Sequence, residues 1–411
     1  MQILDRSFKY SEKLSFFFAL LFTVSIPIST ALMNISVAFL LIFSLFSKDF
    51  YINLKEVVTS KVFISCLIIY SVMIIGYFWS IADSTEINRI LLKYLKLVLI
   101  PLLTIRFFFV KNNLRTLENT IIGTSLFITI LPHLIFLGLL NDQTEIDLYI
   151  TQFEISQTGA FKTHIITNIF VAIASFFSTL RYLYRKEKKY FYISLILFNY
   201  IFILSDGMAG QIISALLIIF LFSKFKFKNI FFFATIGFII TTSLFTEIPS
   251  FGHNEKYTRK VTIDRIVNGI TEYHAEEINN SFEHRLSLWH NGILVFFEKP
   301  LFGYGTGSTN LAFNSNLDIL MSSYDDMSKA SNPHSELIFW LMQFGIFGIT
   351  VVSSVFLFLL KIAINQPDEI TRTNQIGVLL FLLVGSAGTS LIMDSGEGHL
   401  AIILLSAYFA K

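Results

Sequence analysis

Long apolar runs follow one another along almost the whole chain, and they restrict what it can fold into. The first run covers residues 14–47, and others recur as far as the C-terminus. Runs of about 18 residues or more match the thickness of a bilayer when they form α-helices. They are continuous rather than alternating in polarity, which excludes a transmembrane β-barrel. We therefore predict an all-α polytopic membrane protein.

Composition agrees with this prediction. Of the 411 residues, 54% are hydrophobic and 15% are charged, whereas soluble domains carry about 25% charged residues. The net charge of +2 and the apolar surface give no basis for a nucleic-acid partner, and membrane lipids are the expected surroundings. The single cysteine, Cys66, lies inside an apolar run, so no intramolecular disulfide is expected and a packing role fits it.

We count about twelve transmembrane helices by length and hydropathy. The first run is too long for one helix, and we expect it to break near Pro27 and Asn34. The expected spans are 14–30, 31–47, 62–82, 88–110, 117–140, 161–182, 190–205, 208–223, 229–247, 335–360, 374–394 and 398–410.

Lysine and arginine gather in alternate connections between these spans. "RYLYRKEKK" (181–189) and "KFKFK" (224–228) belong to one set, whereas "SIADSTEIN" (80–88) and "NDQTEIDLYITQFE" (141–154) in the other set are acidic. The positive-inside rule then places both termini in the cytoplasm.

One connection on the outer side is far longer than the rest. It divides the chain into a membrane domain of nine spans (1–247), a large outer loop (248–334) and a membrane domain of three spans (335–411). The loop is rich in aromatic and aliphatic residues. Within it, 285–297 has the pattern of an amphipathic interfacial helix that ends before Pro300.

Two common site types find little support. Five histidines fall in the outer loop, but none has metal-ligand spacing, so we expect no metal and no cofactor. "GYGTGS" (303–308) resembles a phosphate-binding loop, yet no lysine follows it, and a tight turn is the simpler interpretation.

His334 stands at the start of an apolar span in "SNPHSELIFW" (331–340). Pro333 suits the first position of a helix, with Asn332 or Ser331 as the N-cap. His334 would then lie in the first turn, where the helix dipole favours a neutral imidazole able to act as a general base. An interfacial histidine with a hydrogen-bonded tip fits the same pattern.

Arg285 begins the amphipathic segment and is the second candidate. Its guanidinium fits either a bidentate clamp on a phosphate or pyrophosphate, with help from Arg265, or simple snorkelling to lipid headgroups.

Four further charged residues lie in or beside spans at the expected outer side. Arg89, Lys93 and Lys96 are spaced at four and three residues, which places them on one face of a continuous helix. Intramembrane cations usually face a polar cavity, although snorkelling is the alternative. Asp394 would bind or orient a cation, or cap a turn.

Two stretches resemble a known family. They are "RLSLWHNGILVFFEKPLFGYGTGS" (285–308) and "NPHSELIFWLMQFGIFG" (332–348). An arginine, a nearby tryptophan, Pro-Leu-x-Gly-x-Gly and then a histidine before a Gly-x-x-Gly span resemble the O-antigen ligase and O-antigen polymerase family. These proteins are membrane glycosyltransferases of the bacterial inner membrane.

The resemblance implies a reaction on the periplasmic face. The donor would be a glycan on undecaprenyl pyrophosphate, and the acceptor a hydroxyl of lipid A–core in a ligase or a second lipid-linked glycan in a polymerase. Arg285 would hold the pyrophosphate, and His334 would activate the acceptor or orient the phosphate, with inversion at the anomeric carbon.

One position departs from the family. In "LSDGMAGQIISALL" (204–217), Met208 stands where the family often has an arginine. Lys93, Lys96 or Arg265 would have to replace that charge. A related protein O-oligosaccharyltransferase and, from another class, a multi-span transporter or flippase are the remaining alternatives; the outer loop with Arg285 and His334 disfavours the transporter.

Overall fold

The computed structural model describes residues 2–137, 139, 144–148, 151–156, 159–162, 164–205, 207–225, 229–245, 281–313 and 332–410. Within these ranges, side chains of 2–9, 144–156, 159–160, 164, 244–245 and 281–284 are excluded from the description. Arg265 and most of the outer loop therefore lie outside the described residues. The prediction that this loop is a domain of its own concerns the same residues and stays a prediction.

The described chain is predominantly helical, which confirms the predicted class. The helices of its first part are α1 (Gln2–Ser25), α2 (Thr30–Leu45), α3 (Lys48–Val58), α4 (Lys61–Ile75), η1 (Gly76–Trp79), α5 (Ser84–Tyr94), α6 (Lys96–Ile105), η2 (Arg106–Val110) and α7 (Leu114–Phe136). Those of its second part are α8 (His164–Arg185), α9 (Lys189–Asn199), η3 (Tyr200–Leu204), α10 (Met208–Phe225), α11 (Ile230–Phe245), α13 (Ser281–Glu298), α15 (Glu336–Ile364), α16 (Glu369–Gly388) and α17 (Ser395–Tyr408).

A small sheet lies between α7 and α8, in a stretch that we expected to be an acidic connection. Its antiparallel strands run in the order β1 (Thr144–Leu148), β2 (Thr151–Ser156) and β3 (Gly159–Ala160). Thr144 pairs with Ile155 at one end of the first ladder and Leu148 pairs with Thr151 at the other. The sheet is an addition to the helical fold that hydropathy did not predict.

Six helices of the described chain are long and apolar enough to cross a membrane. They are Lys61–Trp79, Leu114–Phe136, Ile165–Arg185, Met208–Phe225, Glu336–Ile364 and Glu369–Gly388. The pair α2 and α3 would add a seventh if it is one span, bent by 103°. These helices mark the chain as a membrane protein, and the count of about twelve spans stays a prediction.

The structure has one of the expected breaks and one that was not expected. The break near Pro27 is confirmed, since α1 ends at Ser25 and the side chain of Ser29 accepts the N–H of Leu32 to cap α2. Asn34, however, lies inside α2. The expected span 88–110 consists of α5, α6 and η2, with Leu95 between the first two.

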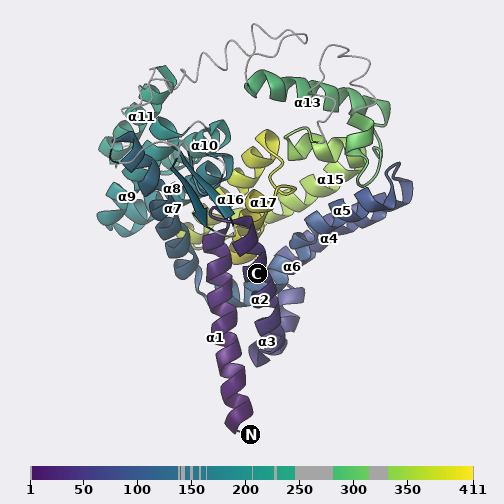
Figure 1. Cartoon of the computed structure of the whole chain (residues 1–411), viewed down its shortest axis with the longest axis horizontal. Helices are drawn as coiled ribbons and strands as arrows, with labels where there is room; N and C mark the ends of the chain where they lie inside the picture. Colours follow the sequence, from purple (N-terminus) through teal and green to yellow (C-terminus); the bar gives the residue numbers. More distant parts are fainter. Residues whose placement is uncertain are drawn as a thin grey trace.

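The helices fall into two groups with α16 and α17 between them (Figure 1). One group contains α7 to α11, and the other contains α4 to α6 and α15. Residues 400–410, which form most of α17, are buried almost throughout, so α17 lies in the core. Helix α13 lies at the end of the molecule opposite to the N-terminus (Figure 1).

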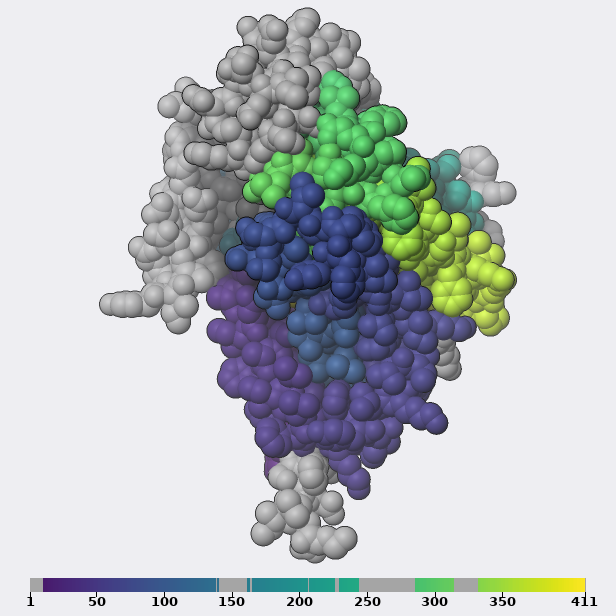
Figure 2. Space-filling view, turned by 90° about the vertical axis from the view of Figure 1, so that its right-hand side faces the viewer, coloured from purple at the N-terminus to yellow at the C-terminus, as the bar shows by residue number. Residues whose placement is uncertain are grey.

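The predicted amphipathic helix is confirmed as α13, and it packs on α15. Leu288 and Val295 are fully buried and form a cluster with Ile338 and Met342 of α15. Phe297, in contrast, is 67% exposed. Figure 2 shows the green residues of α13 and its following loop directly above the blue surface of α4 and α5.

The loop that follows α13 forms hydrogen bonds with α15 at a point where that helix is kinked. Gly345 has a φ of 58° inside that helix, a conformation that residues with a Cβ rarely adopt. There the N–H groups of Ile346 and Phe347 donate to Pro300 O at 2.8 Å and Leu301 O at 3.1 Å. In return Tyr304 N and Gly305 N donate to Met342 O at 3.0 Å and Gln343 O at 2.8 Å. The loop therefore replaces the hydrogen bonds that the helix loses at its break.

Candidate functional site

The segment from Gly388 to Asp394, which we call the 388–394 turn, links α16 to α17 and gathers the candidate residues. It is compact, since Asp394 N donates to Ser390 O at 2.8 Å. It begins at the C-terminus of α16, where helix carbonyls lack intrahelical donors and carry partial negative charge. Such a helix end is a natural contact for a cation.

Arg285 of α13 contacts the beginning of this turn. Its Nη1 donates to Gly388 O at 3.1 Å, and the side chain is half-buried. Among the described residues no carboxylate pairs with this guanidinium, and burial alone lowers its pKa from the ordinary value. A guanidinium has five N–H donors, so Arg285 keeps donors in addition to the one on Gly388 for an anionic group.

His334 is also attached to the turn, but not in the predicted way. The prediction that Pro333 begins the helix is wrong, because α15 begins at Glu336 and Ser335 is its N-cap, with Oγ accepting from Ile338 N. His334 precedes that cap in the left-handed region, at a φ of 50°, with its side chain exposed. His334 therefore lies before the helix and not in its first turn, where we predicted it.

Asn332 links the His334 backbone to the 388–394 turn. Its Oδ1 accepts from His334 N at 3.0 Å and from Ser390 Oγ at 2.6 Å. Arg285 and His334 thus both depend on the same seven-residue turn, Arg285 through Gly388 and His334 through Ser390. The structure brings these two predicted residues together, although they are far apart in sequence.

Glu336 is the residue that sequence reasoning missed. Its buried carboxylate accepts the Tyr94 hydroxyl and Trp340 Nε1, the latter at 3.0 Å. Its other oxygen accepts Ile392 N at 3.1 Å and Met393 N at 3.0 Å. Two of these donors belong to the 388–394 turn, so this carboxylate fixes the turn to the start of α15. An acidic residue at the entrance of an apolar span was the available signal.

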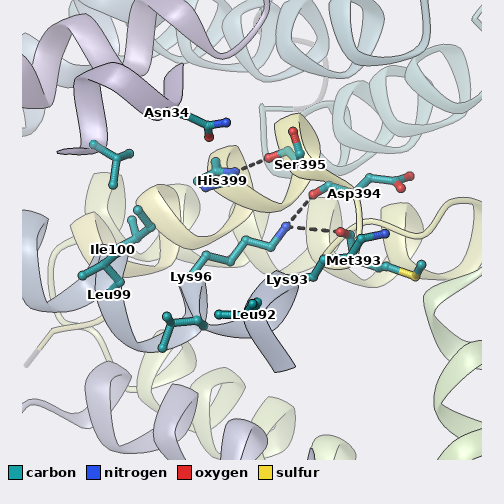
Figure 3. Close-up of a pocket in the computed structure, with 12 residues that line it drawn as sticks. Asn34, Leu92, Lys93, Lys96, Leu99, Ile100, Met393, Asp394, Ser395 and His399 are labelled. Atoms are coloured by element: carbon teal, nitrogen blue, oxygen red, sulfur yellow. Dashed lines mark hydrogen bonds between the residues drawn. The ribbon is translucent and has the colours of Figure 1, made fainter. Parts of the chain in front are cut away.

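Lys96 holds the same turn from the opposite side. Its Nζ donates to Asp394 O at 2.6 Å, with Met393 O at 3.4 Å, and the side chain is only 6% exposed (Figure 3). The peptide units around Met393 therefore lie between a carboxylate that binds their N–H groups and an ammonium that binds their carbonyls. This arrangement compensates two charges whose isolated burial would be costly.

A cavity of about 340 Å³ adjoins Lys96 (Figure 3). Lys93 and Asp394 line it with Lys96, and Leu92, Leu95, Leu99 and Ile100 supply apolar walls. Burial raises the pKa of Asp394, while Lys96 and Lys93 oppose that shift. Three of the charged residues that we predicted at the outer side thus share one cavity.

Arg89 does not join them. Arg89 and Lys93 both lie on α5, whereas the break at Leu95 places Lys96 on α6, so the prediction of one continuous helix face fails for Lys96. Of the three cations, Lys93 and Lys96 line the cavity and Arg89 does not. Its Nε donates to Glu86 Oε2 at 2.7 Å and the side chain is largely exposed. An intrahelical ion pair accounts for this arginine.

The glycine-rich stretch 303–308 is not a phosphate loop. Gly307 N donates to Gln343 Oε1 at 2.6 Å, and Thr306 N donates to Gly76 O at 3.2 Å. Together with the bonds of Tyr304 and Gly305 to α15, these contacts use the amides that a phosphate would need. The expected tight turn is confirmed, with the added role of joining α15 to η1.

Met208 begins α10, beside the buried Asn168 of α8, whose Nδ2 donates to Gly207 O at 2.8 Å. As for a metal, no three His, Cys, Asp or Glu side chains gather in the described parts of the chain in a way that would hold one.

Comparison with known families identifies the class of this site. Residues 191–353 match the model of the O-antigen ligase family, which confirms the predicted resemblance over that part of the chain. The matched region contains Arg285, His334, Glu336 and the kinked half of α15. The family implies a glycosyltransferase-like membrane enzyme that uses a lipid-linked glycan and a lipid acceptor. No curated protein matches the chain.

Proposed function

We propose that the protein is an O-antigen ligase-like transferase of the bacterial inner membrane. It moves a glycan from undecaprenyl pyrophosphate to a hydroxyl of lipid A–core on the periplasmic face. The observation that carries this proposal is Arg285: a half-buried guanidinium bound to Gly388 O, with no carboxylate partner among the described residues, on the turn to which His334 is also attached.

The proposed reaction is a direct displacement at the anomeric carbon. The acceptor oxygen attacks that carbon, and its proton passes to the His334 imidazole. The bond between the anomeric carbon and the pyrophosphate oxygen breaks, and its electron pair stays on the leaving pyrophosphate. Arg285 stabilises that developing charge through bidentate N–H donation. The product has inverted configuration, and no metal takes part.

The family match supports a second candidate in the same class, an O-antigen polymerase whose acceptor is another lipid-linked glycan. A protein O-oligosaccharyltransferase would use the same donor. A transporter is disfavoured by the position of Arg285, whose helix α13 lies at one end of the molecule, because transport sites lie near the membrane midplane.

A lipopolysaccharide gel of a deletion strain distinguishes these activities. Bare core with accumulated lipid-linked polymer indicates a ligase, and core with one repeat unit indicates a polymerase. Unchanged bands contradict both.

Complementation then tests the site. Arg285→Gln and His334→Asn should each fail to restore the missing bands, while immunoblots show normal amounts in the membrane. Lys55→Gln, which removes an exposed ammonium from α3 far from the turn, should restore them. Restored transfer by both site variants would refute the proposed mechanism.

A further inference from the structure

The cavity beside Lys96 combines two cations with an apolar wall, and neither the family match nor the proposed displacement accounts for it. The family match ends at residue 353 in sequence and begins at 191, so it includes none of the lining residues. The volume of about 340 Å³ lies in the range of small-molecule sites, roughly 300–1,000 Å³.

The two ammonium groups of this cavity have no ion pair among the described residues. Lys93 has no hydrogen-bond partner there either, and Lys96 is bound only to the carbonyls of Met393 and Asp394. The nearby Glu336 carboxylate is occupied by four donors. The fold thus compensates Lys96 through these carbonyls, but it leaves the half-buried Lys93 without such a contact among the described residues. Partly buried cations are normally paired, so Lys93 favours an anionic ligand that Lys96 can assist.

One lining group opposes an anion. The carboxylate of Asp394 lies at the same cavity, and in Figure 3 it points away from the Lys96 ammonium, which binds the Asp394 carbonyl instead. The Asp394 side chain forms no cap hydrogen bond on α17. Its charge therefore changes the electrostatics of the cavity without holding the fold, which makes it a useful probe of the ligand's sign.

The rim of the cavity is apolar and open. Leu92 is 69% exposed and Leu95 is 38% exposed. An aliphatic chain leaving the cavity over these leucines would stay on a surface that suits lipid, while its charged end stays beside the lysines. The combination fits a phosphate attached to a hydrocarbon chain better than a free phosphate.

We propose that this cavity binds a lipid phosphate, with Lys93 and Lys96 on the phosphate and the leucine rim on the hydrocarbon chain. It is a second anion site, at the far end of the 388–394 turn from Arg285. The assignment of this cavity to the second lipid substrate, the acceptor of the transfer, rests on the proposed function. The inference that the cavity binds a lipid phosphate is independent of that function.

The test measures binding of geranylgeranyl pyrophosphate to the purified full-length protein in detergent. An Arg285→Gln background removes the proposed donor contact, so that the cavity is measured alone and failure of the transferase proposal leaves the result readable. Lys93→Gln should weaken binding roughly tenfold, because a charge-assisted hydrogen bond is lost. Asp394→Asn should strengthen it roughly threefold, because a like charge is removed.

Controls separate the parts of the ligand and the protein. Lys55→Gln should leave the affinity unchanged, since that exposed lysine lies on α3 outside the cavity. Geranylgeraniol and inorganic pyrophosphate should each bind at least about tenfold more weakly than the intact lipid phosphate. Competition by phosphatidic acid would show that any aliphatic phosphate enters, and absence of competition would restrict the site to isoprenoid phosphates.

Three results would overturn the proposal. They are an unchanged affinity in Lys93→Gln, weaker binding in Asp394→Asn, and equal binding of inorganic pyrophosphate. The second of these would indicate a cationic ligand, and the third a site for free anions.

Discussion

The buried Arg181 and the half-buried Arg285 of this protein have opposite surroundings. Arg181 of α8 is 3% exposed, and its Nε and Nη2 donate to Glu118 of α7 at 3.1 and 2.7 Å. Tyr190 and Arg115 O accept its remaining donors. Arg285 has Gly388 O and no carboxylate among the described residues. The fold thus uses all three nitrogens of the Arg181 guanidinium in hydrogen bonds. Arg285 is held by one hydrogen bond, and its other N–H groups remain available to a ligand.

Arg106 also lies near a carboxylate, although its Nε and Nη1 have no hydrogen-bond partner among the described residues. It is fully buried, donates to Ser44 Oγ at 2.8 Å, lies 3.5 Å from a Glu12 oxygen and stacks over the Phe107 ring. Burial alone therefore does not mark a functional arginine in this chain. What distinguishes Arg285 from both is that no carboxylate of the described residues pairs with it.

The largest effect is expected at Arg181. Arg181→Gln removes the ion pair of the half-buried Glu118, which keeps only the hydrogen bond from the Tyr408 hydroxyl, and this should lower the free energy of unfolding by about 3 kcal/mol. Denaturation in detergent measures this change. Transfer per folded molecule should stay normal. A loss of transfer without a loss of stability would contradict the purely structural role of Arg181.

Arg285→Gln should give the reverse result. Transfer is expected to fall about a hundredfold, equivalent to about 2.7 kcal/mol of barrier, while the free energy of unfolding stays within about 0.5 kcal/mol. Arg285→Lys keeps the charge but loses the planar fork, and should recover only part of the activity. Strong destabilisation by Arg285→Gln would make this residue structural.

Glu336→Gln should fall between these cases, because Glu336 holds the turn that Arg285 contacts. The amide nitrogen of glutamine would face two of the four donors now bound by the carboxylate, which should cost about 2 kcal/mol of stability. Transfer should fall with it, since the Gly388 carbonyl under Arg285 is displaced. Denaturation and transfer assays on the same preparation check both; transfer unchanged at reduced stability would show that the turn does not position Arg285.

The smallest effect separates the backbone of His334 from its imidazole. Asparagine tolerates a φ of 50° better than alanine does, so His334→Ala should be about 1 kcal/mol less stable than His334→Asn. Both should lack transfer if the imidazole is the base. Transfer retained in His334→Asn alone would assign the role of this residue to its backbone.

The sequence predicted much of the fold but less of how its parts connect. Apolar run length predicts helices, and the pattern around Arg285 predicts α13, because both depend on local composition. Neither the kink at Gly345 nor the break at Leu95 follows from such rules, and the kink depends on hydrogen bonds to the distant residues Pro300 and Leu301. The break at Leu95 is why Lys96 does not continue the helix that carries Arg89 and Lys93.

The sequence predicted those residues of the candidate site whose charged or titratable side chains cost free energy beside an apolar span. Arg285, His334 and Lys96 were identified because charged or titratable groups near apolar spans need a reason. Glu336 was overlooked although it follows the same rule. Its importance depends on Tyr94, 242 residues away, and on backbone amides of the 388–394 turn, and no spacing in the sequence predicts such partners.

The exchange of hydrogen bonds at Gly345 also determines which pieces of this protein can be recombined. Residues 300–305 and 342–347 satisfy each other's backbone groups, and a backbone group left without a partner in lipid costs several kcal/mol. A chimera that replaces the outer loop with that of a relative must therefore carry both segments together. The boundary between loop and membrane part lies below the kink, inside α15, rather than at the start of that helix.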